Sequence, residues 1–372
     1  MDDIRHRFET RLAALRAEPS RDDPGDPARL RRIEATRTEM HGQPEALART
    51  LASEEAALAA LAARIRARGF DHVAIVGCGD SWFVGKGVRH ALEEILARPV
   101  LAEQALDFAG YGHRGTGPGG LVIGLSAGGN TPAVMAALER ARARGAFAIG
   151  VSNTPASPVL TAFDAGLVVH ATRRGWPTQS STAAMALLLA LGLKIAPASA
   201  AADALAQALG AVPEAMARTL AAADAPMAKI ASQIAASTML VFAGSGPHGA
   251  TASFGAAKVR ELSNIHAAAF ALEEIHHYRL PKPDDVVFVV APDRHSRERA
   301  LDTALVARAH GARVCVLTAH ADADIDAIAT WTLRVPDVAA GVASLAHAPA
   351  VHALACHFAL ARDAFQRADK RP

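Results

Sequence analysis

The chain has 372 residues, enough for two domains of ordinary size. Its 39 Lys and Arg residues nearly balance its 37 Asp and Glu residues, and it has no basic stripe interleaved with aromatic residues. We therefore expect no nucleic-acid partner. The three cysteines are far apart and lack metal-ligand spacing, so we expect reduced thiols, no metal or other cofactor, and a cytoplasmic protein.

The first 30 residues are predicted to form a polar helix followed by a turn-rich loop. They lack an apolar segment with a small-residue cleavage site, so a signal peptide is not expected. The longest apolar stretch, Ala183 to Leu193, is shorter than the roughly 18 residues of a membrane span. We therefore expect no membrane partner. From Arg31 to Arg66 the apolar spacing is largely helical, and these helices are predicted to brace the first domain.

The remainder of the chain contains an internal duplication. An apolar strand ending in Gly-x-Gly occurs as HVAIVGCGDS at 72–81 and again as TMLVFAGSGPH at 238–248. In the same order, LVIGLSAGGNT at 121–131 corresponds to VVFVVAPDRHS at 286–296, and the helices that follow end in ARARG and ARAHG. The strands are apolar throughout, which is typical of a parallel sheet covered on both faces. We predict an α/β protein with two domains, each a three-layer α/β/α sandwich.

A glycine-rich loop in the first copy follows a strand and precedes a helix. Thr131 at the N-cap and Pro132 at the first helical position predict where that helix begins. Glycines let the backbone approach a ligand, a helix N-terminus favours an anion, and the hydroxyls of Ser126 and Thr131 add donors. The loop can hold a phosphate or a similar group; the alternative is a plain capped turn. The equivalent loop at 291–296 lacks glycine and contains an acid, so only the first copy is expected to bind phosphate.

A second strand-turn-helix signal is GCGDSW at 77–82. It is not a dinucleotide-binding fingerprint, because Trp82 stands where G-x-G-x-x-G requires its third glycine. We therefore expect no nucleotide cofactor.

The most informative segment lies at 244–277. It is predicted to form a glycine-rich turn, a helix from about His248 to Ser263 and an extended stretch from His266 to Ile275. On that helix Lys258 and Glu261 are three residues apart and share a face, which by itself is typical of a surface ion pair. The adjacent histidines at the end of the segment would point to opposite faces of a strand, which disfavours a shared metal.

These motifs together resemble the sugar isomerase (SIS) domain family, which includes the isomerase half of glucosamine-6-phosphate synthase and related phosphosugar isomerases and deglycases. The spacing K-x-x-E followed by His277 is similar to the catalytic segment in the second SIS domain of that synthase. The family's S-x-S-G-x-T loop is matched at Ser126, Gly129 and Thr131, with Gly128 in place of the second serine.

The resemblance extends to other parts of the chain. The family's G-x-G-x-S turn is matched at Gly77, Gly79 and Ser81, and its V-A-S-T helix start at Ser181 and Thr182. For each of these hydroxyls taken singly, helix capping and packing is an equally good interpretation. TEMHGQPEALARTL resembles the segment that precedes the first SIS domain, and the likeness covers about residues 31–365.

The resemblance implies two SIS domains after an N-terminal helical segment. The helical extension would occupy residues 1–50, the phosphosugar-binding domain residues 51–200 and the catalytic domain residues 210–365. It also implies a homodimer in which His277 reaches the site of the neighbouring subunit. The substrate-binding residues implied by the family motifs are Gly79, Ser81, Ser126, Gly128, Gly129, Thr131, Ser181 and Thr182.

The family's chemistry is ring opening of a sugar 6-phosphate followed by proton transfer through an enediol or enediolamine. By resemblance Glu261 moves the carbon-bound proton, His277 acts on the ring oxygen and Lys258 stabilises the enediolate oxygen. The reaction would be an aldose–ketose isomerisation or a deglycase/deaminase reaction on a phosphorylated sugar or amino sugar. The alternative is a non-catalytic sugar-phosphate sensor, which would not need Glu261 and His277.

Several departures from the synthase pattern bear on specificity. Tyr278 and Arg279 follow the histidine where the synthase has Gly-Pro, and Phe254 replaces a glutamate. We therefore expect a substrate other than that of the synthase. The sequence also lacks the N-terminal cysteine glutaminase domain and the catalytic lysine tail, so a complete glutamine-dependent synthase is not expected.

Overall fold

The structure, a computed structural model, describes residues 6, 8–13, 27–278 and 281–369. Most of the helix and loop predicted for the first 30 residues lies outside these residues. Arg279 also lies outside them. Within them, the helical prediction for Arg31 to Arg66 is confirmed by α2 (Pro27–His41) and α3 (Gln43–Arg68). Helix α3 runs through residue 50, so no break in secondary structure marks the predicted domain boundary there.

The first domain is built on a sheet of five parallel strands in the order β2-β1-β3-β4-β5. Its strands are β1 (His72–Gly77), β2 (Val100–Gln104), β3 (Gly120–Leu125), β4 (Phe147–Ser152) and β5 (Ala165–Val168). Helices cover both faces, because alternate residues of strands such as β1 join different apolar clusters. One face carries α3, α4 (Asp80–Leu96) and α8 (Gln179–Ile195); the other carries α5 (Ala105–Gly110), α6 (Pro132–Ala143) and α7 (Pro158–Thr161).

The second domain repeats this arrangement with strands in the order β10-β9-β8-β6-β7, also parallel. Its strands are β6 (Met239–Gly244), β7 (His266–Ala271), β8 (Val286–Val290), β9 (Arg313–Thr318) and β10 (Trp331–Arg334). The face turned to the first domain carries α9 (Ala200–Gln233), α10 (Pro247–Ser263) and α14 (Ala343–Asp369), and the other carries α12 (Arg297–Ala309) and α13 (Ala323–Ile328). The two predicted three-layer sandwiches are confirmed.

The glycine turn after the first strand has the same backbone in both copies. Gly79 has φ 54° and ψ −128°, and Gly246 has φ 52° and ψ −128°. A positive φ favours glycine, since other residues meet a steric penalty there. The duplication read from the sequence is therefore also a duplication of backbone geometry.

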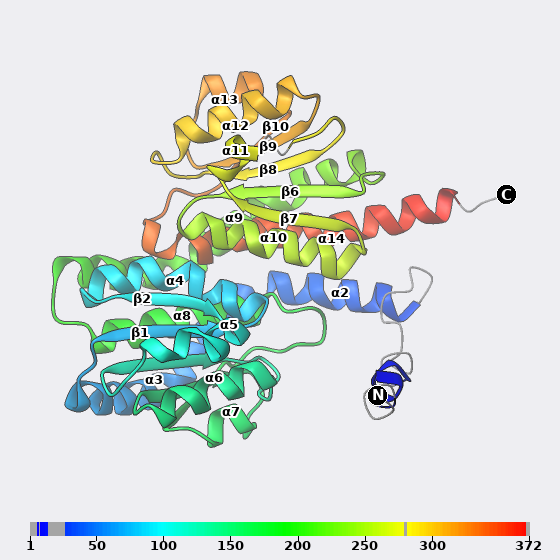
Figure 1. Ribbon diagram of the computed structural model, residues 1–372. Helices are drawn as coiled ribbons and strands as arrows, with labels where there is room; N and C mark the ends of the chain where they lie inside the picture. Colours follow the sequence, from blue (N-terminus) through cyan, green and yellow to red (C-terminus); the bar gives the residue numbers. More distant parts are fainter. Residues whose placement is uncertain (1–5, 7, 14–26, 279–280, 370–372) are drawn as a thin grey trace.

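The two domains share one hydrophobic core. A single apolar cluster includes Ile75 of the first sheet and Phe242 of the second, with the helices between them. Figure 1 shows α4 and α10 lying between the two sheets. Phe83 on α4 and Phe254 on α10 meet edge to face with ring centroids 5.7 Å apart. This packing brings the α10 side chains against the first domain.

The extended stretch predicted from His266 to Ile275 is wrong in its second half. Strand β7 ends at Ala271, and a short helix, α11 (Glu274–Tyr278), follows. Glutamate in the first turn and histidines in the last turn favour this helix, because they complement its dipole. His276 and His277 therefore lie on a helix, not on opposite faces of a strand.

The longest apolar helix is α14, not the stretch at Ala183 to Leu193. The segment Ala340–Ala368 is long and apolar enough to cross a membrane, which the sequence prediction had missed. Within the fold, however, 94% of its apolar window is buried. Its hydrophobicity is thus accounted for by its central place in the shared core.

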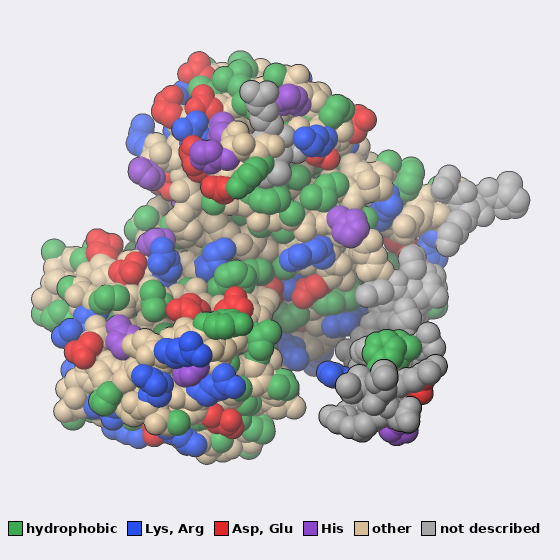
Figure 2. All heavy atoms as spheres, in the orientation of Figure 1, with side chains coloured by type: hydrophobic (Ala, Val, Ile, Leu, Met, Phe, Trp, Pro, Cys, Tyr) green, Lys and Arg blue, Asp and Glu red, His purple; other side chains and the backbone are tan. Residues whose placement is uncertain are grey.

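Acidic and basic side chains are interspersed on the surface. On the face shown in Figure 2, Lys and Arg lie among Asp and Glu and form no continuous stripe of one sign. On this face the distribution agrees with the small net charge of +2.

Candidate functional site

A cavity of about 260 Å³ opens at the carboxyl ends of β1, β3 and β4. This is the edge where ligands bind in open parallel sheets, at the point where the strand order reverses. Of the predicted site residues, those that line the cavity are Gly79, Ser81, Ser126, Gly128, Thr131, Ser181 and Glu261. Glu261 comes from the second domain, so the cavity is closed by both halves of the chain.

The glycine-rich loop at one wall of the cavity is organised around Ser126. Its Oγ accepts hydrogen bonds from the backbone amides of Gly129, at 3.0 Å, and Thr131, at 3.2 Å, and lies 2.8 Å from the Thr131 hydroxyl. Thr131 is the N-cap residue of α6, as predicted, but its side chain bonds to Ser126 and makes no cap hydrogen bond. The Ser126 proton then points at Thr131, which leaves the Thr131 hydroxyl proton available to a ligand.

Two glycines of this loop have different roles. Gly129 has φ +79°, and a β-carbon there would lie 2.1 Å from the Ser157 hydroxyl. Gly129 therefore shapes the loop from behind and does not line the cavity. Gly128 lines the cavity and has room for a side chain, since the nearest atoms to a β-carbon would be 3.8 Å and 3.9 Å away.

The opposite wall holds a buried ionic cluster formed by both domains. The Lys258 ammonium on α10 lies 2.6 Å from a carboxylate oxygen of Asp80 at the start of α4, and it also contacts the Glu261 carboxylate. Lys258 is only 1% exposed. The Ser181 hydroxyl donates to the same Asp80 oxygen at 3.3 Å. The predicted ion pair exists, but Lys258 is buried between the domains and is not on a helix surface.

Two groups of this cluster, Lys258 and Glu261, lie on α10, and both have shifted pKa values. Burial lowers the pKa of the Lys258 ammonium, but the carboxylates of Asp80 and Glu261 outweigh this effect, so its pKa lies above the ordinary value. Burial raises the pKa of Glu261; the Lys258 cation opposes this, and the neighbouring Asp80 adds to it. A raised pKa suits a carboxylate that both accepts and returns a proton near neutral pH.

Besides Gly129, three predicted residues do not line the cavity within one chain. The Lys258 ammonium lies behind Glu261 and is not part of the lining. Thr182 is fully buried and donates to Gln43 at 3.3 Å, so it connects α8 to α3. His277 on α11 is exposed, and its Nε2 lies 3.9 Å from the Glu273 carboxylate.

Asp80 is the residue that the sequence reasoning missed. It was not among the predicted site residues, yet its carboxylate contacts both the Lys258 ammonium and the Ser181 hydroxyl. One available signal was its place at the first position of a helix after Gly-x-Gly, where a carboxylate is favoured by the helix dipole. Its partner, far away in the sequence, could not be inferred from that position.

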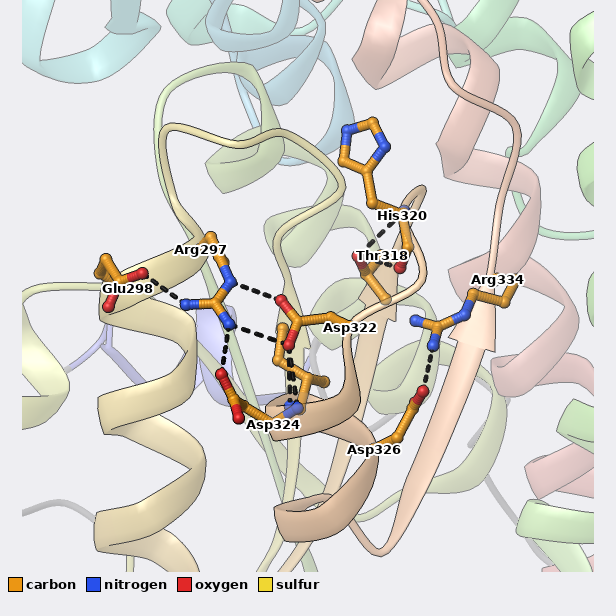
Figure 3. Close-up of polar contacts among 9 residues, drawn as sticks. Arg297, Glu298, Thr318, His320, Asp322, Asp324, Asp326 and Arg334 are labelled. Atoms are coloured by element: carbon orange, nitrogen blue, oxygen red, sulfur yellow. Dashed lines mark hydrogen bonds and ion pairs between the residues drawn. The ribbon is translucent and has the colours of Figure 1, made fainter.

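The equivalent edge of the second sheet is filled by ion pairs. Figure 3 shows Arg297 at the start of α12 between the carboxylates of Glu298, Asp322 and Asp324. One Arg297 nitrogen donates to Asp322 at 3.0 Å and to Asp324 at 2.7 Å. A cavity of about 300 Å³ next to it is lined by acids of this group. The lining also contains Arg294, so charges of both signs border this cavity, and the expectation that only the first copy binds phosphate stays a prediction.

The family model described as the SIS domain matches residues 68–194 and residues 233–361. The chain belongs to the SIS domain family. Its two SIS domains coincide with the two sheets, and the resemblance drawn from the sequence motifs is confirmed.

Known SIS proteins similar to this chain include sugar-phosphate enzymes. It is 29% identical over 343 residues to the glutamine–fructose-6-phosphate aminotransferase (isomerizing) of Caulobacter vibrioides, covering 88% of this chain and 56% of that protein. The chain spans about half the length of the curated relatives it matches.

Solved structures share the fold along most of the chain. The C-terminal domain of glucosamine-fructose-6-phosphate aminotransferase from Francisella tularensis has a TM-score of 0.74 at 19% identity, covering 88% of this chain and 96% of that one. The tagatose-6-phosphate ketose/aldose isomerase of Escherichia coli has a TM-score of 0.72 at 20% identity, covering 89% and 92%. At these identities the likeness establishes the fold.

Proposed function

We propose that this SIS protein is an enzyme that binds a sugar 6-phosphate or amino-sugar 6-phosphate and moves a proton between adjacent carbons of its open-chain form. The observation that carries the proposal is the position of Glu261, a carboxylate with a raised pKa that lines the same cavity as the anion-binding loop. A phosphate on Ser126 and Thr131 would place the carbon chain toward that carboxylate. Relatives named as aminotransferases and isomerases of phosphosugars support this class.

In the proposed reaction Glu261 removes the proton from the carbon next to the carbonyl group. The electron pair of the broken C–H bond forms the enediolate, and the carbonyl oxygen takes the negative charge. The proton of the neighbouring hydroxyl group then passes to that oxygen, Glu261 returns its proton to the former carbonyl carbon, and the new carbonyl group forms at the neighbouring carbon, which completes an isomerisation. If the neighbouring carbon carries an amine in place of the hydroxyl group, the same carbon-to-carbon transfer gives an imine, and water hydrolyses this imine to a carbonyl group and the free amine, as in a deglycase or deaminase. Lys258 acts through Glu261, because its ammonium orients that carboxylate and adds a positive charge behind it.

The anion-binding loop is tested by the affinity for sugar phosphates. We expect Ser126→Ala to weaken binding of fructose 6-phosphate and glucosamine 6-phosphate by about 10-fold, because two backbone amides and Thr131 lose their shared partner. Thr131→Ala is expected to act in the same direction. Isothermal titration calorimetry measures both. Ser296→Ala, at the position that matches Thr131 in the second copy, is the control and should change nothing. Equal affinities for wild type and Ser126→Ala would refute the assignment of this loop.

The reaction itself is identified by a substrate screen. Phosphorylated ketoses, amino sugars and conjugates of fructose 6-phosphate with amino acids are incubated with the protein, and both isomerised product and released amine are measured. Isomerised product without amine identifies an isomerase, and amine release identifies a deglycase or deaminase. Tight binding with no conversion of any of these compounds would instead favour a sensor and contradict the enzymatic proposal.

We also propose that the active unit is a homodimer in which His277 acts on the ring oxygen in the partner's cavity. His277 is exposed and lies outside the cavity of its own chain, so it is free to act elsewhere. Glu261→Gln and His277→Ala should each lower turnover by about 10²-fold or more. Mixed after refolding in equal amounts, they should recover about a quarter of wild-type activity, because half of the dimers then contain one intact site of two. No recovery, or a fully active monomer in light scattering, would contradict this arrangement.

A further inference from the structure

Arg173 lies beside the anion-binding loop and belongs to none of the sequence motifs described above. Arg173 is in the segment between β5 and α8, and its guanidinium Nη1 is 3.9 Å from the position that a β-carbon on Gly128 would occupy. Its side chain is exposed and makes no hydrogen bond or ion pair with the residues that the structure describes. A charged group so close to the loop, and not engaged by a neighbouring carboxylate, is available to a ligand.

The backbone on either side of Arg173 is held by helix α2. The buried carboxylate of Glu39 accepts hydrogen bonds from the Thr172 hydroxyl at 2.6 Å and from the amides of Arg174, at 2.8 Å, and Gly175, at 3.0 Å. The Thr36 hydroxyl on the same helix accepts from the Trp176 amide at 2.8 Å.

Through these bonds, helix α2 fixes the backbone of the segment that carries Arg173. A β-carbon on Gly175 would lie 2.2 Å from Thr36, so the segment can run this close to α2 only with glycine there. The guanidinium of Arg173 therefore extends from a fixed point of the chain, which reduces the entropy lost when it binds a ligand.

The surroundings of Arg173 suit a phosphate monoester. Gly128 and Thr131, the N-cap residue of α6, both line the cavity, and a helix N-terminus favours an anion. A guanidinium binds phosphate through two parallel hydrogen bonds, which a single hydroxyl cannot do. The two carboxylates of the cavity, Asp80 and Glu261, are paired with Lys258 and form no ion pair with Arg173 among the described residues.

We propose that Arg173 binds the phosphate group of the substrate and replaces the hydroxyl that is missing at Gly128. The inference rests on the proposed sugar-phosphate function and names the group that gives this site its preference for a phosphorylated ligand. Arg173 is a binding residue: it lowers the dissociation constant, and the proton transfer at Glu261 proceeds without it.

Calorimetry with glucosamine 6-phosphate and with inorganic phosphate tests the proposal. Arg173→Ala should weaken the binding of both ligands by about 10- to 100-fold, since a charge-assisted bidentate contact is lost. Arg173→Lys should recover only part of the affinity. Arg174→Ala is the matched control, because it removes the same charge from the adjacent position and should leave both affinities within about twofold. Circular dichroism of each variant verifies that it is folded.

A second variant tests whether the arginine compensates for the missing hydroxyl. Gly128 has an ordinary φ, and no atom lies within 3.4 Å of the position that a β-carbon would take, so Gly128→Ser should fit without strain. In the Arg173→Ala background, Gly128→Ser should restore about 3- to 10-fold of the lost affinity. In the wild-type background it should add little, because the guanidinium already binds the phosphate.

The outcomes separate this inference from the proposed function. If wild type binds glucosamine 6-phosphate and Arg173→Ala binds it equally well, the inference is wrong and the proposed function stands. If Arg174→Ala loses as much affinity as Arg173→Ala, the effect comes from the overall positive charge near the site, and the inference is also wrong. If wild type binds inorganic phosphate through Arg173 but binds no sugar phosphate, the arginine is confirmed as the anion ligand and the proposed substrate class fails.

Discussion

Replacing Glu261 by Gln is expected to lower turnover of the substrate found in the screen by about 10²- to 10⁴-fold, the range for loss of a general base. The change keeps the shape of the side chain but removes its ability to accept a proton. The anion-binding loop is untouched, so the affinity for the sugar phosphate should stay within about threefold. Steady-state kinetics and calorimetry on the same preparation separate the two effects.

The pH dependence adds a second readout for Glu261. Its raised pKa places the acid limb of the wild-type profile of kcat/KM at higher pH than an ordinary glutamate would give. This limb should disappear from the residual activity of Glu261→Gln. Glu94→Gln, on the exposed side of α4, makes the same change of charge and should match wild type. Near-normal turnover by Glu261→Gln would assign the proton transfer to another group.

Replacing Lys258 by Met is expected to destabilise the protein by about 3 to 5 kcal/mol, the usual cost of removing one partner from a buried ion cluster. The substitution preserves most of the side-chain volume, but it leaves Asp80 and Glu261 facing each other without a cation. Urea unfolding followed by circular dichroism measures the change. Lys229→Met, on the exposed side of α9, is the control, expected within about 0.5 kcal/mol of wild type.

The pH dependence of this loss has a defined sign. With Lys258 absent, the folded-state pKa of Glu261 rises further above its unfolded value, so the folded protein binds protons more tightly. The variant is then relatively more stable at acidic pH, and its stability falls as the pH rises through the raised folded pKa. The triple variant Asp80→Asn, Lys258→Met, Glu261→Gln should recover part of the lost stability, because no uncompensated charge remains. Equal stability of Lys258→Met and wild type at pH 8 would contradict a structural role for the cluster.

Local patterns were sufficient for much of the fold. The apolar strands, the start of α6 at Pro132 and the extent of α10 depend on neighbouring residues, so periodicity and capping signals predicted them. The duplication carried the prediction further, because a repeated strand-turn-helix order implies the same sheet twice. The short helix α11 was missed because its acidic and basic ends were overlooked beside the apolar run before it.

The sequence by itself determined the two SIS sheets and the loop that can hold an anion, because both follow from residues that are close together along the chain. Only the tertiary structure decided which side chains meet. Packing of α4 against α10 buried Lys258 on Asp80, and packing of α3 against α8 turned Thr182 toward Gln43 and away from the cavity. Helix α2 fixed the segment that carries Arg173 beside Gly128. These contacts join residues far apart in sequence, and their geometry is set by how helices pack in the shared core.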